Sequence, residues 1–258
     1  AEVGMGVVDA AVEHRHRHAL AGDAVGAAAT GGARLLVDQW IGQRHDCRRD
    51  EQATDEAHPV DAADPALLQA LGIKDVIVLN GEVNGRFAHN PEPLPEHLTQ
   101  LSSEVVKQKA DLGIAVDPDV DRLCFVCEDG SMFGEEYTLV AVADYVLTRR
   151  TGNTVSNMSS TKALREVTEK KGGRYTPSAV GEVNVVQKMK ETSAVIGGEG
   201  NGGIIVPDFH YGRDALIGIG LFLSHLAEYG KSIKSLRGTY PDYFISKNKI
   251  ELTEGTDL

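Results

Sequence analysis

The chain has 258 residues, of which 41% are hydrophobic, enough for one large domain or two of ordinary size. Its net charge of −12 argues against nucleic acid or an anionic membrane surface as a partner. Three cysteines are an odd and sparse set, which argues against a secreted disulfide framework. No apolar run is long enough to span a membrane, so we expect a cytoplasmic location.

Residues 1–64 differ in composition from the remainder of the chain. They contain no Lys and no Phe but many Ala, Arg, Asp and His, and the first lysine is Lys74. We expect an atypical segment, either a solvated or disordered extension or a stretch that is not native to the protein. Its histidines lack the regular spacing of a transition-metal site, and we assign no function to it.

From Pro65 onward, helical and strand patterns alternate, which is typical of mainly parallel α/β sheets. In chain order, we expect helices at 65–71, 96–109, 135–150, 162–171, 183–190 and 214–229, and strands at 76–79, 112–116, 123–127, 154–157 and 194–197. A seam near Ser131 predicts two domains, at 65–133 and 134–245, with 246–258 as the start of a linker to a further domain.

An acidic loop lies between the second and third predicted strands. Asp117, Asp119 and Asp121 alternate with other residues there, next to Arg122. Open α/β sheets place ligands at strand ends, and three carboxylates suit Mg²⁺ better than Zn²⁺ because they are hard oxygen donors. An acidic surface turn is the plainer interpretation, but it leaves the mutual repulsion of the carboxylates uncompensated.

A calcium loop of the EF-hand kind is a competing interpretation of the same residues. Asp117, Asp119, Asp121 and Glu128 fall at its positions 1, 3, 5 and 12. The pattern requires Gly at position 6 and helices on both sides, whereas this chain has Arg122 there and predicted strands as flanks. We therefore reject this interpretation.

A glycine-rich loop follows the strand at 194–197. Its glycines let a ligand approach the backbone, and Glu199 and Asn201 offer acceptor and donor groups to adjacent sugar hydroxyls. A flexible turn is the plainer alternative. A dinucleotide loop is a poor match, because the Gly-x-Gly-x-x-Gly spacing and a following helix are missing.

The two loops together resemble those of the α-D-phosphohexomutases. Residues 117–122 resemble the family's metal loop, usually Asp-Gly-Asp-Gly-Asp-Arg, and residues from Gly198 onward resemble its Gly-Glu-x-Ser-Gly sugar loop. The resemblance begins near Pro65 and implies the second and third of four domains, each a mixed or parallel α/β sandwich. It implies Mg²⁺ as cofactor on the three Asp, Arg122 beside a phosphoserine, and a sugar held by Gly198, Glu199 and Asn201.

Three further segments have more than one interpretation. Glu182 stands where the family often has His, so it could transfer a proton or cap the following helix. Arg213 could contact a substrate phosphate or form an ion pair with Asp214 at a helix start. The segment 89–93 resembles a family loop that we interpret as structural.

Cys124 and Cys127 have Cys-x-x-Cys spacing within a predicted strand. Odd spacing in a strand sends two side chains to opposite faces, so we expect buried thiols rather than a redox or zinc pair.

By resemblance, the complete enzyme moves phosphate between the 1- and 6-positions of a hexose through a phosphoserine and a bisphosphate. Glucose, mannose and glucosamine phosphates all remain open as partners. The sequence lacks the family's Thr-Ala-Ser-His-Asn-Pro serine motif and its Arg-x-Ser-Gly-Thr-Glu phosphate site, so we expect this part to be inactive alone. A non-catalytic metal- or sugar-phosphate-binding module and an Asp-dependent phosphatase are the alternative functions.

Overall fold

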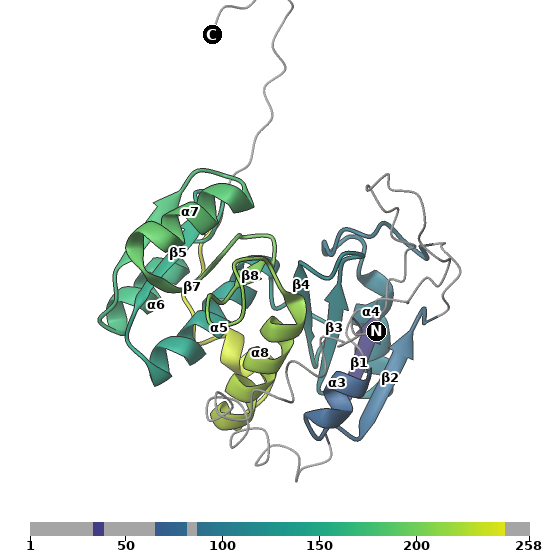
Figure 1. Cartoon of the computed structure of the whole chain (residues 1–258). Helices are drawn as coiled ribbons and strands as arrows, with labels where there is room; N and C mark the ends of the chain where they lie inside the picture. The colour runs from purple at the N-terminus through teal and green to yellow at the C-terminus, as the bar shows by residue number, and fades with distance from the viewer. Residues whose placement is uncertain (1–32, 39–64, 82–86, 246–258) are drawn as a thin grey trace, which may run out of the picture.

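The computed structural model describes residues 33–38, 65–81 and 87–245, which form two four-stranded sheets with their helices (Figure 1). Two expectations lie outside these residues: the linker at 246–258 and most of the atypical segment 1–64. The part of that segment that is described, residues 33–38, belongs to the first sheet.

The first sheet contains β1 (Arg34–Asp38), β2 (Asp75–Leu79), β3 (Leu112–Val116) and β4 (Leu123–Cys127), in the order β2-β1-β3-β4. The first three strands are parallel, and β4 runs antiparallel to β3. Because β1 lies between β2 and β3, the first domain does not begin at residue 65 as we expected. Its side chains Leu35, Leu36 and Val37 are at most 1% exposed.

Helix α3 (Pro65–Ala70) lies on one face of this sheet and α4 (Thr99–Gln108) on the other. Alternation along β1 sends Leu35 toward the cluster that contains Leu68 of α3, and Leu36 toward the cluster that contains Leu101 of α4. The two strands that carry the acidic loop between them, β3 and β4, are buried along their whole length. The loop therefore begins and ends on a rigid part of the sheet.

The second sheet contains β5 (Asn153–Asn157), β6 (Tyr175–Ser178), β7 (Ala194–Gly198) and β8 (Ile204–Ile205), in the order β6-β5-β7-β8. Strands β5, β6 and β7 are parallel, and β8 is antiparallel to β7. Its helices are α5 (Glu135–Arg149), α6 (Ala163–Lys170), α7 (Glu182–Thr192), α8 (Ala215–Tyr229) and α9 (Ile233–Arg237).

A shared hydrophobic core joins the two sheets. Helix α5 packs against both β4 and β7, and α8 packs against α5, β4 and β8. Phe222 of α8 stacks on Phe125 of β4, with ring centroids 3.8 Å apart, and meets Phe133 edge to face. One cluster of buried residues consequently extends from β1 to α9.

The outer edge of β4 is covered by backbone from two later segments. The Leu123 amide donates to the Gly202 carbonyl at 3.2 Å, and the Phe125 carbonyl accepts from Phe133 at 2.9 Å. The Cys127 amide donates to Ser131 at 2.7 Å. The glycine-rich loop is thus attached directly to the strand that follows the acidic loop.

Cys124 and Cys127 are free, buried thiols in separate clusters on opposite faces of β4, which confirms the expected arrangement. Burial raises the pKa of Cys127 to about 11. None of the helices in the described ranges is long and apolar enough to cross a bilayer.

Candidate functional site

The acidic loop turns sharply between β3 and β4. Asp117 follows β3 directly and is 1% exposed. Its Oδ1 accepts hydrogen bonds from the backbone amides of Asp121, at 3.0 Å, and Arg122, at 2.8 Å. The carboxylate therefore folds the loop around itself, while its other oxygen lies 2.8 Å from Arg122 Nε and accepts no hydrogen bond.

Val120 adopts the left-handed backbone conformation at the centre of this loop, with φ of 58°. This conformation is costly for a β-branched residue, and Gly is common at this position of the family loop. Burial offsets the cost, because the side chain is only 9% exposed, and the carbonyl accepts a hydrogen bond from Ala215 at 3.0 Å.

The three aspartates can hold a divalent cation. One carboxylate oxygen from each lies within 4.8 Å of those of the other two. Within the described part of the chain, the buried side-chain atoms without a hydrogen-bond partner are Asp117 Oδ2, Asp121 Oδ1 and Arg122 Nε. The Nε lies 2.8 Å from the first oxygen and 3.6 Å from the second, without hydrogen-bond geometry. Two buried carboxylate oxygens that accept no hydrogen bond, beside an exposed third ligand, Asp119, fit Mg²⁺.

The protein balances the negative charge of this loop only in part, through the ion pairs of Arg122 and Arg213 with Asp117 and Asp121. Burial raises the pKa of Asp117 above its ordinary value. Burial, and then the neighbouring Asp117 charge, raise the pKa of Asp121 to about 7, although Arg213 opposes the shift. A bound cation would favour the ionised form of both carboxylates.

The glycine-rich loop joins β7 to β8 and presents Glu199, which is 6% exposed. Its carboxylate accepts from Asn157 Nδ2 at 2.7 Å and from the Gly181 amide at 3.3 Å. Close packing explains two glycines of the loop: a Cβ on Gly198 would lie 2.0 Å from the Gly203 carbonyl oxygen, and one on Gly202, where φ is +87°, would lie 2.3 Å from the Leu123 carbonyl oxygen.

Asn201 holds the turn of this loop, because its Oδ1 accepts from the Gly203 amide at 3.2 Å. Its side chain and Glu199 both line a cleft of about 230 Å³. Sugar binding by these two residues stays a prediction, and their position in a cleft is compatible with it.

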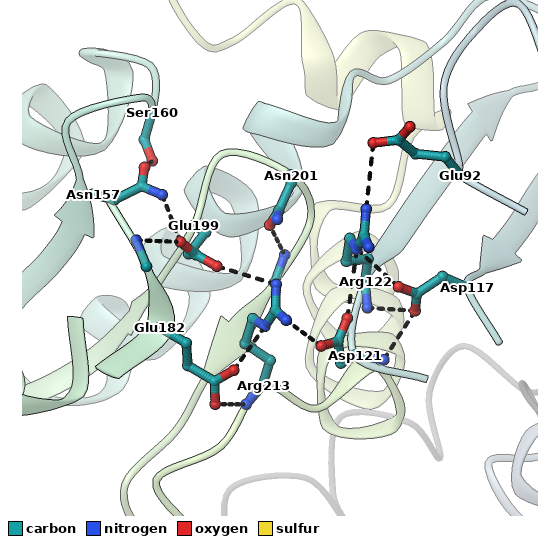
Figure 2. Close-up of polar contacts among 12 residues, drawn as sticks. Glu92, Asp117, Asp121, Arg122, Asn157, Ser160, Glu182, Glu199, Asn201 and Arg213 are labelled. Atoms are coloured by element: carbon teal, nitrogen blue, oxygen red, sulfur yellow. Dashed lines mark hydrogen bonds and ion pairs between the residues drawn. The ribbon is translucent and has the colours of Figure 1, made fainter. Parts of the chain in front are cut away.

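Arg213 connects the two loops and precedes α8. Figure 2 shows its guanidinium between Asp121, Glu182 and Glu199. Nη1 lies 3.1 Å from Glu199 Oε2, Nε lies 3.1 Å from Glu182 Oε2, and Nη2 contacts Asp121 Oδ2. Arg213 therefore pairs with these three carboxylates and not with Asp214, the ion-pair partner that the sequence suggested.

Asp214 instead caps helix α8, because its Oδ1 accepts from the Ile217 amide at 3.0 Å. Its Oδ2 lies 2.9 Å from His210 Nε2. The expected helix start at this position is therefore correct, and the local polar partner is His210.

The suggested capping role of Glu182 is wrong. The N-cap of α7 is Gly181, without a side-chain cap hydrogen bond, and Glu182 is the first helical residue. Its carboxylate accepts from Arg213, through the backbone amide at 3.4 Å and through Nε. Glu182 is thus a partner of Arg213, and proton transfer by it stays untested.

The cleft also contains residues that sequence patterns did not single out. Glu92, from the segment 89–93 that we interpreted as structural, lines it and lies 3.5 Å from Arg122 Nη1. Asn157, at the end of β5, orients Glu199 and in turn accepts from Ser160 at 2.7 Å. The position of Asn157 at the end of a strand was a signal that the sequence offered, but its pairing with Glu199, 42 positions away, was not.

Comparisons with known proteins place both sheets in one family. A family model described as phosphoglucomutase/phosphomannomutase, alpha/beta/alpha domain II, matches residues 60–130, and the corresponding domain III matches residues 134–243. The phosphoglucomutase/phosphomannomutase of Thermococcus kodakarensis is 35% identical over 72% of this chain and 41% of its own length. The phosphoglucosamine/phosphogalactosamine mutase of Sulfurisphaera tokodaii is 31% identical over 78% of this chain and 45% of its own length.

A solved structure of a phosphoglucomutase/phosphomannomutase family protein from Burkholderia thailandensis is similar, with a TM-score of 0.67 and 26% identity. The match covers 84% of this chain and 46% of that one. The chain thus spans less than half the length of these relatives. It belongs to the phosphoglucomutase/phosphomannomutase family, the α-D-phosphohexomutases, and matches their domains II and III.

Proposed function

We propose that this chain provides the cation-binding and sugar-recognition parts of a phosphohexomutase. The observation that carries the proposal is the cleft between the two loops, lined by Arg122 beside the aspartates and by Glu199 and Asn201. A phosphorylated sugar needs both kinds of group, positive charge for phosphate and fixed acceptors for hydroxyls. The complete enzyme would interconvert hexose 1-phosphate and hexose 6-phosphate through a phosphoserine and a bisphosphate.

Asp117, Asp119 and Asp121 would hold Mg²⁺, which when bound supplies charge neutralisation at a phosphoryl group. Arg122 faces the cleft and is 31% exposed, so its guanidinium can orient the same group. Glu199 is fixed by its donors and would accept hydrogen bonds from sugar hydroxyls, while Asn201 offers an amide.

The substrate would be a hexose phosphate, with glucose, mannose and glucosamine phosphates as candidates. The names of the relatives include glucose, mannose, glucosamine and galactosamine activities, so they do not select one sugar. Because the printed sequence contains no Thr-Ala-Ser-His-Asn-Pro motif, we propose that these 258 residues bind the sugar phosphate without turning it over.

Titration calorimetry with Mg²⁺ and the full chain tests the cation site. Asp119→Asn replaces an exposed ligand, so the fold should survive while the affinity falls by roughly tenfold or more. Asp208→Asn is the matched control, because Asp208 is a half-exposed aspartate that pairs with Arg150 instead. Equal Mg²⁺ affinity in the wild type and Asp119→Asn would refute the assignment.

Titration of glucose 6-phosphate, mannose 6-phosphate and glucosamine 6-phosphate into the same chain tests the sugar site. We expect Glu199→Gln to weaken binding of the preferred sugar phosphate, because the amide has only one acceptor oxygen and cannot keep both of the hydrogen bonds to Asn157 and Arg213. If none of the three compounds binds the wild type, the sugar part of the proposal fails.

A further inference from the structure

Arg213 is the residue through which the acidic loop and the glycine-rich loop meet. Its side chain is 16% exposed and contacts carboxylates from three segments that are far apart in sequence. The separations from Arg213 are 92 positions to Asp121, 31 to Glu182 and 14 to Glu199. Each of its three guanidinium nitrogens is engaged with a different carboxylate.

The pairing fixes which oxygen of Asp121 is left for a cation. Arg213 holds Oδ2, while Oδ1 is buried and has no hydrogen-bond partner. This Oδ1 is directed to the same place as Asp117 Oδ2, since both face Arg122 Nε (Figure 2). An outer partner that holds one carboxylate oxygen sets the direction of the other, which is how neighbours of metal ligands tune affinity.

Glu182 in turn fixes the orientation of the Arg213 side chain. It binds the backbone amide and Nε of Arg213, and it starts helix α7, so it ties the guanidinium to a rigid element. Gly203 lies against the aliphatic part of Arg213, where a Cβ would come within 2.4 Å of Cδ. The planar fork therefore has one orientation, which a flexible ammonium group could not reproduce.

We propose that Arg213, oriented by Glu182, is a positioning residue that presents Asp121 to the divalent cation and couples the cation site to Glu199 in the glycine-rich loop. This inference rests on the proposed cation site. In this role Arg213 acts through the carboxylates that it holds. If cation binding moves the Asp121 carboxylate, the guanidinium of Arg213 would pass that movement on to Glu199.

Calorimetric Mg²⁺ affinities of the wild type, Arg213→Lys, Glu182→Gln and the double variant test the inference. Lys keeps the positive charge but not the fork, so we expect roughly a tenfold loss of affinity. Glu182→Gln should weaken binding severalfold in the wild-type background and have no added effect in Arg213→Lys, because its influence passes through the guanidinium. Arg150→Gln, which breaks the ion pair with Asp208, should bind as the wild type does.

The outcomes separate the two proposals. If the wild type takes up no Mg²⁺, both the cation site and the role of Arg213 are wrong. If the wild type binds Mg²⁺ and Arg213→Lys binds it equally well, the positioning role alone is overturned. Additive effects of Glu182→Gln and Arg213→Lys would also overturn it, because they indicate long-range charge instead.

A measurement on the wild type covers the case in which a variant does not fold. The Arg213 Nε–Hε resonance in a nitrogen-15 NMR spectrum should shift as Mg²⁺ saturates the site, while the Arg150 resonance stays in place. An unchanged Arg213 resonance at saturation would overturn the coupling to the cation site. Circular dichroism of each variant at the titration temperature establishes that the compared chains are folded.

Discussion

At the scale of single residues, the acidic loop combines a buried, an exposed and a half-buried carboxylate, Asp117, Asp119 and Asp121. Their shared position at a strand end could be predicted from sequence, because the alternating aspartates lie between two apolar runs. The link to Arg213 could not, because nothing local indicates a partner 92 positions away. The role of Glu182 was uncertain for the same reason.

The left-handed backbone of Val120 reverses the usual order of stability of Gly and Ala variants at one position. Gly removes the strain of the left-handed backbone, about 1–3 kcal/mol, and also the buried side chain, about 1.5–3 kcal/mol. Ala removes the side chain but keeps much of the strain. We therefore expect Val120→Gly to be more stable than Val120→Ala, by about 1 kcal/mol in urea unfolding. The reverse order would show that the backbone of this loop is not strained.

His225 should make stability depend on pH. Burial lowers the pKa of His225, although Asp144, 3.7 Å away, opposes the shift. The folded chain therefore favours the neutral ring, while the unfolded chain takes up a proton as the pH falls through about 6.5. The free energy of unfolding should fall as the pH is lowered from about 7.5 to 5.5.

The comparison variant for this effect is His225→Gln. Gln keeps a nitrogen donor toward Tyr240, which lies 2.9 Å from His225 Nε2, but it does not titrate. Urea unfolding at both pH values should show a smaller pH dependence in His225→Gln than in the wild type. An identical pH dependence would mean that other groups cause it.

At the scale of elements, most helices and five of the eight strands in the described residues were predicted close to their observed positions. The strands at 112–116 and 123–127 have the expected bounds, and most helices differ by one or two residues at their ends. The helix expected from 96 starts at Thr99. The two strands are continuous apolar runs that are buried along their whole length, which made them recognisable in the sequence.

Strands β1, β6 and β8 and the short helix α9 were not predicted. β1 was hidden by the unusual composition around it, although Leu35, Leu36 and Val37 form a continuous apolar run. β6 contains Pro177, which is tolerated because β6 is an edge strand, and β8 has two residues. Only the pairing of strands in three dimensions reveals such elements.

Gly202 allows the glycine-rich loop to pack closely against β4. Its positive φ and the 2.3 Å that would separate a Cβ from the Leu123 carbonyl oxygen leave no room for a side chain. We expect Gly202→Ala to lower the free energy of unfolding by about 2 kcal/mol or more. Urea unfolding measures this loss.

Gly220, inside α8, is the matched control for Gly202, because a Cβ there would meet nothing within 4 Å. Gly220→Ala should raise stability by about 0.5–1 kcal/mol, since Ala is the better helix former. If both alanine variants lose stability equally, the tight packing of the loop on β4 is not the cause of the loss.

At the scale of the whole molecule, the two sheets share one core, so we expect them to unfold together. Phe222→Leu removes the stack on Phe125 and the edge contact with Phe133 and should cost about 1–3 kcal/mol. Hydrogen exchange should show the same loss of protection in β3 and in β7. A loss confined to one of the sheets would indicate that each unfolds separately.

The covered edge of β4 has a consequence for self-association. The sequence Leu-Cys-Phe-Val-Cys is uncharged and apolar throughout, the kind of strand that readily recruits another chain when its outer backbone groups are free. Gly202, Phe133 and Ser131 already occupy those groups at Leu123, Phe125 and Cys127. The glycine-rich loop therefore also shields the Leu123 end of this strand, and loosening the loop would expose that end to intermolecular pairing.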